Sequence, residues 1–159
     1  MAQVTIITLG TLKESFWTEA VAEYKKRLGL YAKVEEINLK EERITNEDSI
    51  SDITTALDAE GDKILAKIPD GAWVVALCVE GKQVDSLRLA SLIGEAVDKS
   101  GKICLIIGSS HGLADKVKRR ADYKLSISQL TFPHQLVRVA LYEMLYRSFT
   151  IRAGKKYHK

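Results

Sequence analysis

The chain has 159 residues, of which 46% are apolar and 28% are charged, as is usual for a globular protein. A chain of this length buries a substantial core, so we expect a single domain over residues 1–159. No basic N-terminal segment precedes an apolar run with a cleavage site, and the uncharged stretches are far shorter than the roughly 20 residues that span a bilayer. We therefore expect a cytoplasmic protein without a signal peptide or a membrane span.

The cysteines and histidines do not form a metal or redox motif. Cys78 and Cys104 lie within apolar runs and no CxxC motif occurs, which favours buried core thiols over a disulfide or a redox pair. The three histidines are spread along the chain without the spacing of metal ligands. We expect neither a structural metal nor a disulfide framework.

The net charge of +3 is unevenly distributed along the chain. Eight acidic residues and one basic residue lie between Glu41 and Asp62, whereas six Lys or Arg and one acid lie between His134 and Lys159. The segment Lys116–Lys124 contains five more basic residues. This polarity favours an anionic partner for the basic part of the chain.

Strand-like and helix-like apolar patterns alternate from one end of the chain to the other. In chain order, the predicted elements are a strand over 4–9, a helix over 13–30, a strand over 33–39, an acidic loop over 41–49, a helix over 51–68, a strand over 73–79, a helix over 87–98, a strand over 103–107, a helix over 114–120, a strand over 123–127 and a helix over 136–149. This alternation predicts an α/β fold with a mostly parallel sheet.

Local signals refine this outline. The segments 73–79 and 103–107 are apolar without alternation, which is typical of parallel strands covered on both faces. Ser51 and Ser86 are expected to cap the helices that follow them. Pro133 is well placed as the first residue of the last helix, where its missing N–H costs nothing.

The carboxyl ends of the last strands are where a ligand binds in an open α/β sheet. The loop after residue 107 places Gly108 and Gly112 around two hydroxyls, so a ligand could approach its backbone closely, although an ordinary strand-to-helix turn is the alternative. It matches neither GxxxxGK[ST] nor GxGxxG, which argues against phosphate or dinucleotide binding. The loop Ile127–Pro133 mixes polar and apolar groups and suits a ligand of adenosine size.

Two polar residues lie on one face of the predicted last helix. His134 and Arg138 are four positions apart, in a helix that is otherwise largely apolar. Arg138 needs a partner, because an unpaired buried charge is costly. A bound anion, Glu143 or Glu80 could be that partner. The unusual loop before the helix favours a functional role for both residues over simple packing.

A specific pattern occurs at the C-terminal end. Residues 131–138 read TFPHQLVR, Glu143 and Tyr146-Arg147 follow, and the chain ends in Tyr157-His158-Lys159. GTLK at 10–13, EYKKRL at 23–28 and the pair Glu60-Gly61 extend the pattern over the whole chain. On these motifs the sequence resembles the ribosomal RNA large subunit methyltransferase H family, small bacterial enzymes of the SPOUT class that methylate N3 of a pseudouridine.

The resemblance implies a SPOUT fold, a parallel α/β sheet whose C-terminal part is threaded into a trefoil knot. It implies S-adenosylmethionine as the cofactor, 23S rRNA in the assembled ribosome as the substrate, and a homodimer in which the neighbouring subunit completes each active site. The cofactor-binding residues implied by the family pattern are Leu77, Gly108, Ile127, Ser128, Gln129, Leu130, Thr131 and Phe132. The sequence departs from the family at Ser109, where a second glycine is usual, and so adds a side chain beside the cofactor loop.

Methyl transfer from a sulfonium is an in-line displacement, so catalysis consists mainly of positioning and removal of the N3 proton. We expect Arg138 to supply positive charge that stabilises the N3 anion and to contact the RNA, and His134 to position the base or its phosphate. His158 or bulk water would take the proton. The tail residues expected to bind RNA phosphates and bases are Lys155, Lys156, Tyr157, His158 and Lys159.

Three alternatives stay open at this point. The first is a SPOUT enzyme for another RNA, such as tRNA. The second is a ribosome-binding assembly factor that has kept the fold without the chemistry. The third is a flavodoxin-like or nicotinamide-dependent oxidoreductase, which the absence of a matching phosphate loop disfavours.

Overall fold

The computed structural model describes all residues from 1 to 159 and contains five strands and five helices in strict alternation. The strands are β1 (Ala2–Leu9), β2 (Ala32–Leu39), β3 (Trp73–Lys82), β4 (Lys102–Ile107) and β5 (Tyr123–Leu125). The helices are α1 (Ser15–Leu28), α2 (Ile50–Leu65), α3 (Ser86–Ser100), α4 (Asp115–Arg120) and α5 (His134–Arg152). The predicted order of elements is confirmed.

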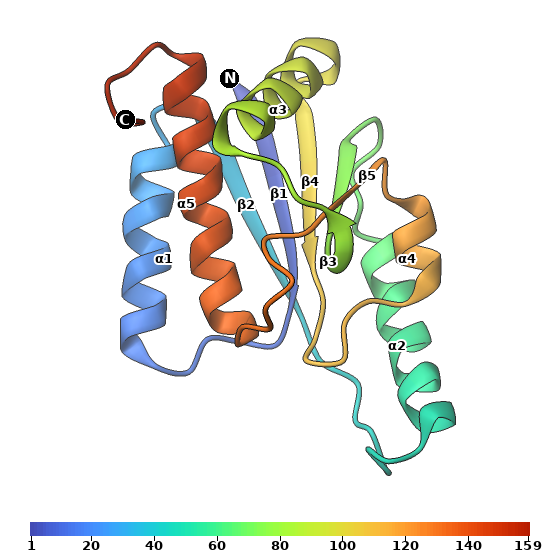
Figure 1. Cartoon of the computed structure of the whole chain (residues 1–159). Coiled ribbons are helices and arrows are strands. Elements are labelled where there is room, and N and C mark those ends of the chain that lie inside the picture. Colours follow the sequence, from blue (N-terminus) through green and yellow to red (C-terminus); the bar gives the residue numbers. More distant parts are fainter.

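The five strands form one sheet in the order β2-β1-β4-β3-β5, and every neighbouring pair is parallel. This confirms the predicted α/β fold with a parallel sheet. Because all strands run in one direction, their carboxyl ends share one edge of the sheet, at the lower end in Figure 1. The loops that follow β3, β4 and β5 therefore come from the same part of the molecule.

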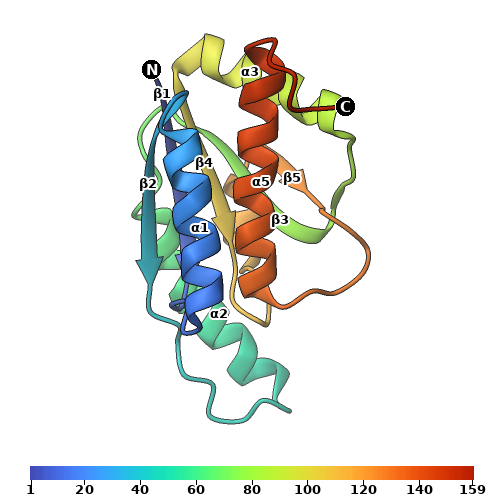
Figure 2. The same cartoon turned by 90° about the vertical axis from the view of Figure 1, so that its left-hand side faces the viewer.

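Helices cover both faces of the sheet, which explains why its central strands are apolar throughout. Figure 2 shows α1 and α5 in front of the sheet, with α3 crossing at the upper end. These helices share one core with Val75 and Leu77 of β3. On the opposite face, α2 and α4 share a second core with Val74 and Ala76. Successive residues of β3 thus enter opposite cores.

Three predicted helix starts are wrong by one or two positions. The side chain of Ser49, not Ser51, accepts the backbone N–H at the start of α2, at 3.2 Å. Asp85 caps α3 instead of Ser86, and its carboxylate accepts a backbone N–H at 2.7 Å. Pro133 precedes α5 as its cap residue, with ψ of 138°, so it is not the first helical residue. In each case a polar residue or a proline with extended backbone stands just before the helix.

The chain beyond β5 passes very close to the end of β3. A Cβ on Gly81 would lie 2.6 to 2.8 Å from backbone atoms of Leu125, so only glycine permits this approach. The N–H of Ser126 donates to the carbonyl of Lys82 at 2.9 Å. This crossing fixes the start of the segment that leads to α5.

The trefoil knot stays a prediction. None of the helices combines the length and the apolar character that a membrane span requires.

Candidate active site

A cavity of about 760 Å³ opens at the carboxyl ends of β3, β4 and β5. Its walls come from three chain segments, 77–80, 107–113 and 125–134 without Gln129, together with Lys118 of α4 and Val137 of α5. Leu130 and Phe132 are 70% and 40% exposed and give the cavity an apolar rim. The volume is within the range of small-molecule and cofactor sites.

The structure brings most of the predicted cofactor residues together. Seven of the eight line this cavity, and the exception is Gln129, which is exposed to solvent. The seven are Leu77, Gly108, Ile127, Ser128, Leu130, Thr131 and Phe132. They come from three different strand ends, so the shared cavity is a product of the parallel sheet.

The turn after β4 has a compact shape that depends on its glycines. A Cβ on Gly108 would overlap the carbonyl group of Gly112 and the side chain of Leu113. The N–H of Gly112 donates to the carbonyl of Ser109 at 2.9 Å, and Gly112 has a φ of +92°. Glycine at these two positions therefore lets the chain fold tightly against the cavity.

The cavity wall also contains residues that were not among the predicted site residues, and three of them carry ionisable side chains close together. Glu80 and Lys118 form an ion pair at the rim, and the hydrogen bond from Lys118 lowers the pKa of the Glu80 carboxyl. Cys78 is half-buried in the wall, and burial, followed by the charge of Glu80, raises the pKa of its thiol. The expectation of a core thiol is confirmed for Cys104 but is wrong for Cys78. Its place beside Leu77, near the carboxyl end of the predicted strand over 73–79, was the available signal.

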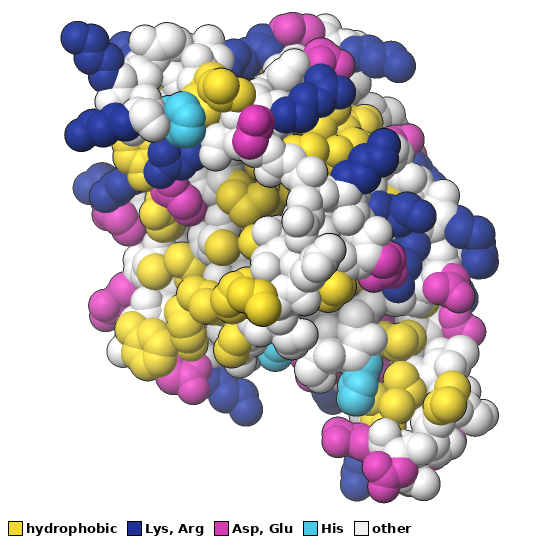
Figure 3. All heavy atoms as spheres, viewed as in Figure 1, with side chains coloured by type: hydrophobic (Ala, Val, Ile, Leu, Met, Phe, Trp, Pro, Cys, Tyr) yellow, Lys and Arg dark blue, Asp and Glu magenta, His cyan; other side chains and the backbone are white.

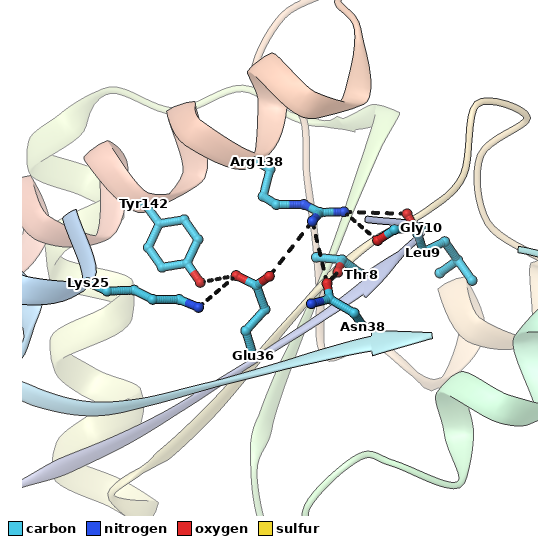
Figure 4. A network of polar contacts seen from close by, with 8 residues as sticks. All are labelled: Thr8, Leu9, Gly10, Lys25, Glu36, Asn38, Arg138 and Tyr142. Carbon is cyan, nitrogen blue, oxygen red and sulfur yellow. Dashed lines mark hydrogen bonds and ion pairs between the residues drawn. The ribbon is translucent and has the colours of Figure 1, made fainter. Parts of the chain in front are cut away.

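The two polar residues of α5 are placed differently. His134 lines the cavity at the start of the helix, whereas Arg138 does not line it. The Arg138 side chain is 2% exposed and its Nη1 lies 3.7 Å from the Glu36 carboxylate on β2. The predicted carboxylate partners Glu143 and Glu80 are therefore wrong, because they pair with Arg147 and Lys118, and a bound anion as a further partner stays a prediction. Figure 4 shows that α5 lies over β1 and β2, so the side chain of Arg138 is directed toward Glu36.

The Arg138 guanidinium also binds the end of β1. Its Nη2 donates to the carbonyls of Leu9 and Gly10 at 3.4 and 3.1 Å, and its Nε has no partner. Burial lowers the pKa of Arg138, and the charge of Glu36 opposes this shift. Arg138 thus ties the first turns of α5 to the loop after β1.

The Glu36 carboxylate is the centre of this buried network (Figure 4). It accepts a hydrogen bond from the hydroxyl of Tyr142 and lies 3.4 Å from the Lys25 ammonium. Burial and the hydrogen bond to Glu36 raise the pKa of Tyr142 far above its usual value. Two cations and one phenol share a single carboxylate, so its negative charge is well compensated.

The predicted RNA-binding tail lies at the other end of α5 from the cavity (Figure 1). The hydroxyl of Tyr157 donates to the Glu143 carboxylate at 2.9 Å, and the Arg147 guanidinium lies 4.7 Å from the centroid of the Tyr157 ring. His158 Nδ1 is 3.3 Å from Arg147. Lys155, Lys156 and Lys159 are exposed. The tail turns back along α5 as far as Glu143, which is nine residues or about 13 Å of helix from His134 at the cavity, so the tail does not line the cavity of its own chain.

Comparisons with known proteins agree with the fold. The chain matches the family model described as "Predicted SPOUT methyltransferase" over residues 2–158. It is 46% identical to ribosomal RNA large subunit methyltransferase H of Caldicellulosiruptor bescii, over 98% of this chain and 99% of that protein. The protein of the same name from Streptococcus agalactiae serotype III is 45% identical over 99% of both chains.

One similarity to a solved structure concerns the fold alone. The crystal structure of a probable methyltransferase from Bordetella pertussis Tohama I superimposes with a TM-score of 0.55, at 14% sequence identity. The match covers 93% of this chain and 96% of that one.

Proposed function

The chain belongs to the SPOUT methyltransferase family, and on that premise we propose that it methylates N3 of a pseudouridine in 23S rRNA with S-adenosylmethionine, acting on the assembled ribosome. Relatives at 45–46% identity bear the name ribosomal RNA large subunit methyltransferase H, which supports large-subunit rRNA as the substrate. The observation that carries the proposal is the cavity at three strand ends, because it is lined by residues that the family pattern assigns to the cofactor.

The dimensions and chemistry of the cavity fit this cofactor. Its volume of about 760 Å³ accommodates an adenosine with an amino-acid arm. Leu77, Leu130 and Phe132 offer apolar surface for the adenine ring, and the turn at Gly108 lets a ligand approach the backbone. The cofactor would supply an electrophilic methyl group on its sulfonium. The chain's own task is to hold both reactants in line and to exclude water.

Within this proposal, His134 and Arg138 have different positions relative to the substrate. His134 faces the cavity and would position the target base or its phosphate. Arg138 remains the proposed source of positive charge for the N3 anion, although Glu36 compensates that charge in the structure. A contact between Arg138 and the RNA would require the guanidinium to leave Glu36. In its observed place, Arg138 holds the first turns of α5, and so His134, against β1.

A homodimer is part of the proposal, because the tail and the cavity of one chain lie at opposite ends of α5. The apolar side chains of Phe16, Leu130, Phe132 and Leu136 are 38–70% exposed at the cavity end. Figure 3 shows apolar side chains gathered over the lower parts of α1 and α5. We infer that a second copy covers this surface and brings its own tail to the cavity. His158 of the partner subunit is then a candidate proton acceptor.

Two measurements test the proposed function. Calorimetry with S-adenosylmethionine should give a defined binding isotherm, and its absence would favour a ribosome-binding factor without methyl-transfer activity. Transfer of a tritiated methyl group should label ribosomes more than free 23S rRNA, with the label recovered as N3-methylpseudouridine by nucleoside mass spectrometry. Label found in tRNA instead would assign the enzyme to another RNA.

A further inference from the structure

Glu60 of α2 is a buried carboxylate outside the cavity of the proposed active site. Glu60 is 4% exposed, and both of its carboxylate oxygens accept hydrogen bonds. Oε1 accepts from the hydroxyl of Ser109 at 3.0 Å, and Oε2 accepts from the backbone N–H of Glu42 at 2.9 Å. One side chain therefore joins the loop after β2 to the turn after β4.

The position of Glu60 is fixed by the packing of α2. A Cβ on Gly61 would lie 3.0 Å from the Cβ of Ala114, so α2 approaches the start of α4 closely. Lys116 of α4 lies 2.9 Å from the Asp62 carboxylate. The contacts of the two residues that follow Glu60 thus hold its carboxylate in register with the turn.

The orientation of Ser109 follows from this contact. Ser109 belongs to the wall of the large cavity, but its hydroxyl donates to Glu60, which lies outside that cavity. The Ser109 carbonyl accepts the N–H of Gly112 and closes the turn. The added side chain is therefore directed toward α2 and leaves the space of the cavity free.

We propose that Glu60 is a positioning residue for the methyl-donor site and acts through Ser109 on the Gly108–Gly112 turn. The inference rests on the proposed function, because the turn is expected to hold S-adenosylmethionine. A turn that is already fixed loses less conformational entropy when a ligand binds, so the hydrogen bond raises affinity without touching the ligand. An ionised carboxylate accepts from both donors at once and suits this role.

Substitutions that remove or mimic the carboxylate test the proposal in the full-length protein. Ser109→Ala should weaken S-adenosylmethionine binding on the order of five- to tenfold, since one hydrogen bond to a charged group is lost. Its KM for S-adenosylmethionine should rise, while the KM for ribosomes stays close to wild type. Ser91→Ala is the matched control, because that hydroxyl also donates to a glutamate but lies on exposed α3.

Variants of Glu60 provide the second arm. Glu60→Ala should weaken binding at least as much as Ser109→Ala, and adding Ser109→Ala to it should cause no further loss. Glu60→Gln should restore affinity, because the amide can accept from the Glu42 N–H and donate to the Ser109 hydroxyl.

Wild-type affinity in Ser109→Ala would overturn the proposal, and so would independent, additive losses in the double variant. If Glu60→Ala does not fold, Ser109→Ala and Glu60→Gln decide the question. Failure of the wild-type protein to bind S-adenosylmethionine would instead contradict the proposed function, so the two failures are distinguishable.

Discussion

α5 carries two polar networks that differ sharply in burial. In its first half, the side chains of Arg138 and its partner Glu36 are 2% and 6% exposed. In its second half, Arg147 and Glu143 are 30% and 24% exposed, and they hold the tail through Tyr157 and His158. The first network joins α5 to the sheet, whereas the second joins α5 to the last residues of the chain.

The difference in burial implies a difference in function. Breaking a buried ion pair leaves an uncompensated charge away from water, which is strongly unfavourable. A half-exposed pair is screened by water and contributes little to stability, so it can open at small cost. We infer that the Arg138 network keeps the cavity end of α5 fixed, while the Arg147 network can release the tail to bind RNA.

The largest effect is expected when the tail itself is removed. Deletion of residues 157–159 should abolish methylation of ribosomes, because the proposed RNA contacts of Tyr157, His158 and Lys159 are lost. Binding of S-adenosylmethionine, measured by calorimetry, should persist, since the cavity lies at the other end of α5. Loss of cofactor binding in this variant would contradict the separation of the two ends.

The next largest effect is expected when the buried Arg138 network is disrupted. Arg138→Ala should lower the free energy of unfolding by about 3 kcal/mol, because Glu36 loses its buried cation and keeps only the more exposed Lys25 as a positively charged partner. Arg152→Ala is the control, since its ion pair with Asp98 is exposed and should be worth about 1 kcal/mol or less. Urea denaturation measures both. If Arg138→Ala lost methylation with unchanged stability, a direct role of the charge in catalysis would be favoured.

Alkaline pH should lower the stability of the folded chain by a smaller amount, through its buried tyrosines. The hydroxyl of Tyr142 is buried on Glu36, and burial and then the hydrogen bond to Glu143 raise the pKa of Tyr24 to about 12. The unfolded chain loses these protons near pH 10 and the folded chain retains them, so the contribution is complete below pH 10 and falls as pH rises.

Urea denaturation at pH 9 and pH 11 checks this expectation. The fall in stability between the two values should be smaller in Tyr142→Phe than in the wild type, and it should change less in Tyr24→Phe. A spectrophotometric titration should show one tyrosine that ionises only as the protein unfolds. An unchanged fall in Tyr142→Phe would contradict the buried assignment.

The smallest effect concerns the lock on the tail. Glu143→Gln should lower the free energy of unfolding by less than about 1 kcal/mol, because its contacts are half-exposed. It should nevertheless loosen Tyr157 and speed tryptic cleavage after Lys155 and Lys156 several-fold. Glu95→Gln, in the exposed pair with Arg88, is the control and should leave the cleavage rate unchanged. Equal cleavage rates in wild type and Glu143→Gln would show that Glu143 does not hold the tail.

Local sequence patterns determined the order of elements and the parallel sheet, because apolar runs such as 73–79 report burial on both faces directly. They also placed the site at the strand ends, since parallel strands bring successive carboxyl ends to one edge. Seven of the eight residues expected to bind the cofactor line one cavity there. The helix caps failed by one or two positions because serine, aspartate and proline near a helix start satisfy the same local rules.

The tertiary structure alone decided which distant groups meet. Glu36 and Arg138 lie on β2 and α5, and Glu60 and Ser109 on α2 and the turn after β4. Nothing in the spacing of these residues encodes the pairing, because it follows from the strand order β2-β1-β4-β3-β5 and from the faces that the helices cover. A charged residue in an apolar segment indicates from the sequence that it needs a partner, but the packing of the elements determines which residue that partner is.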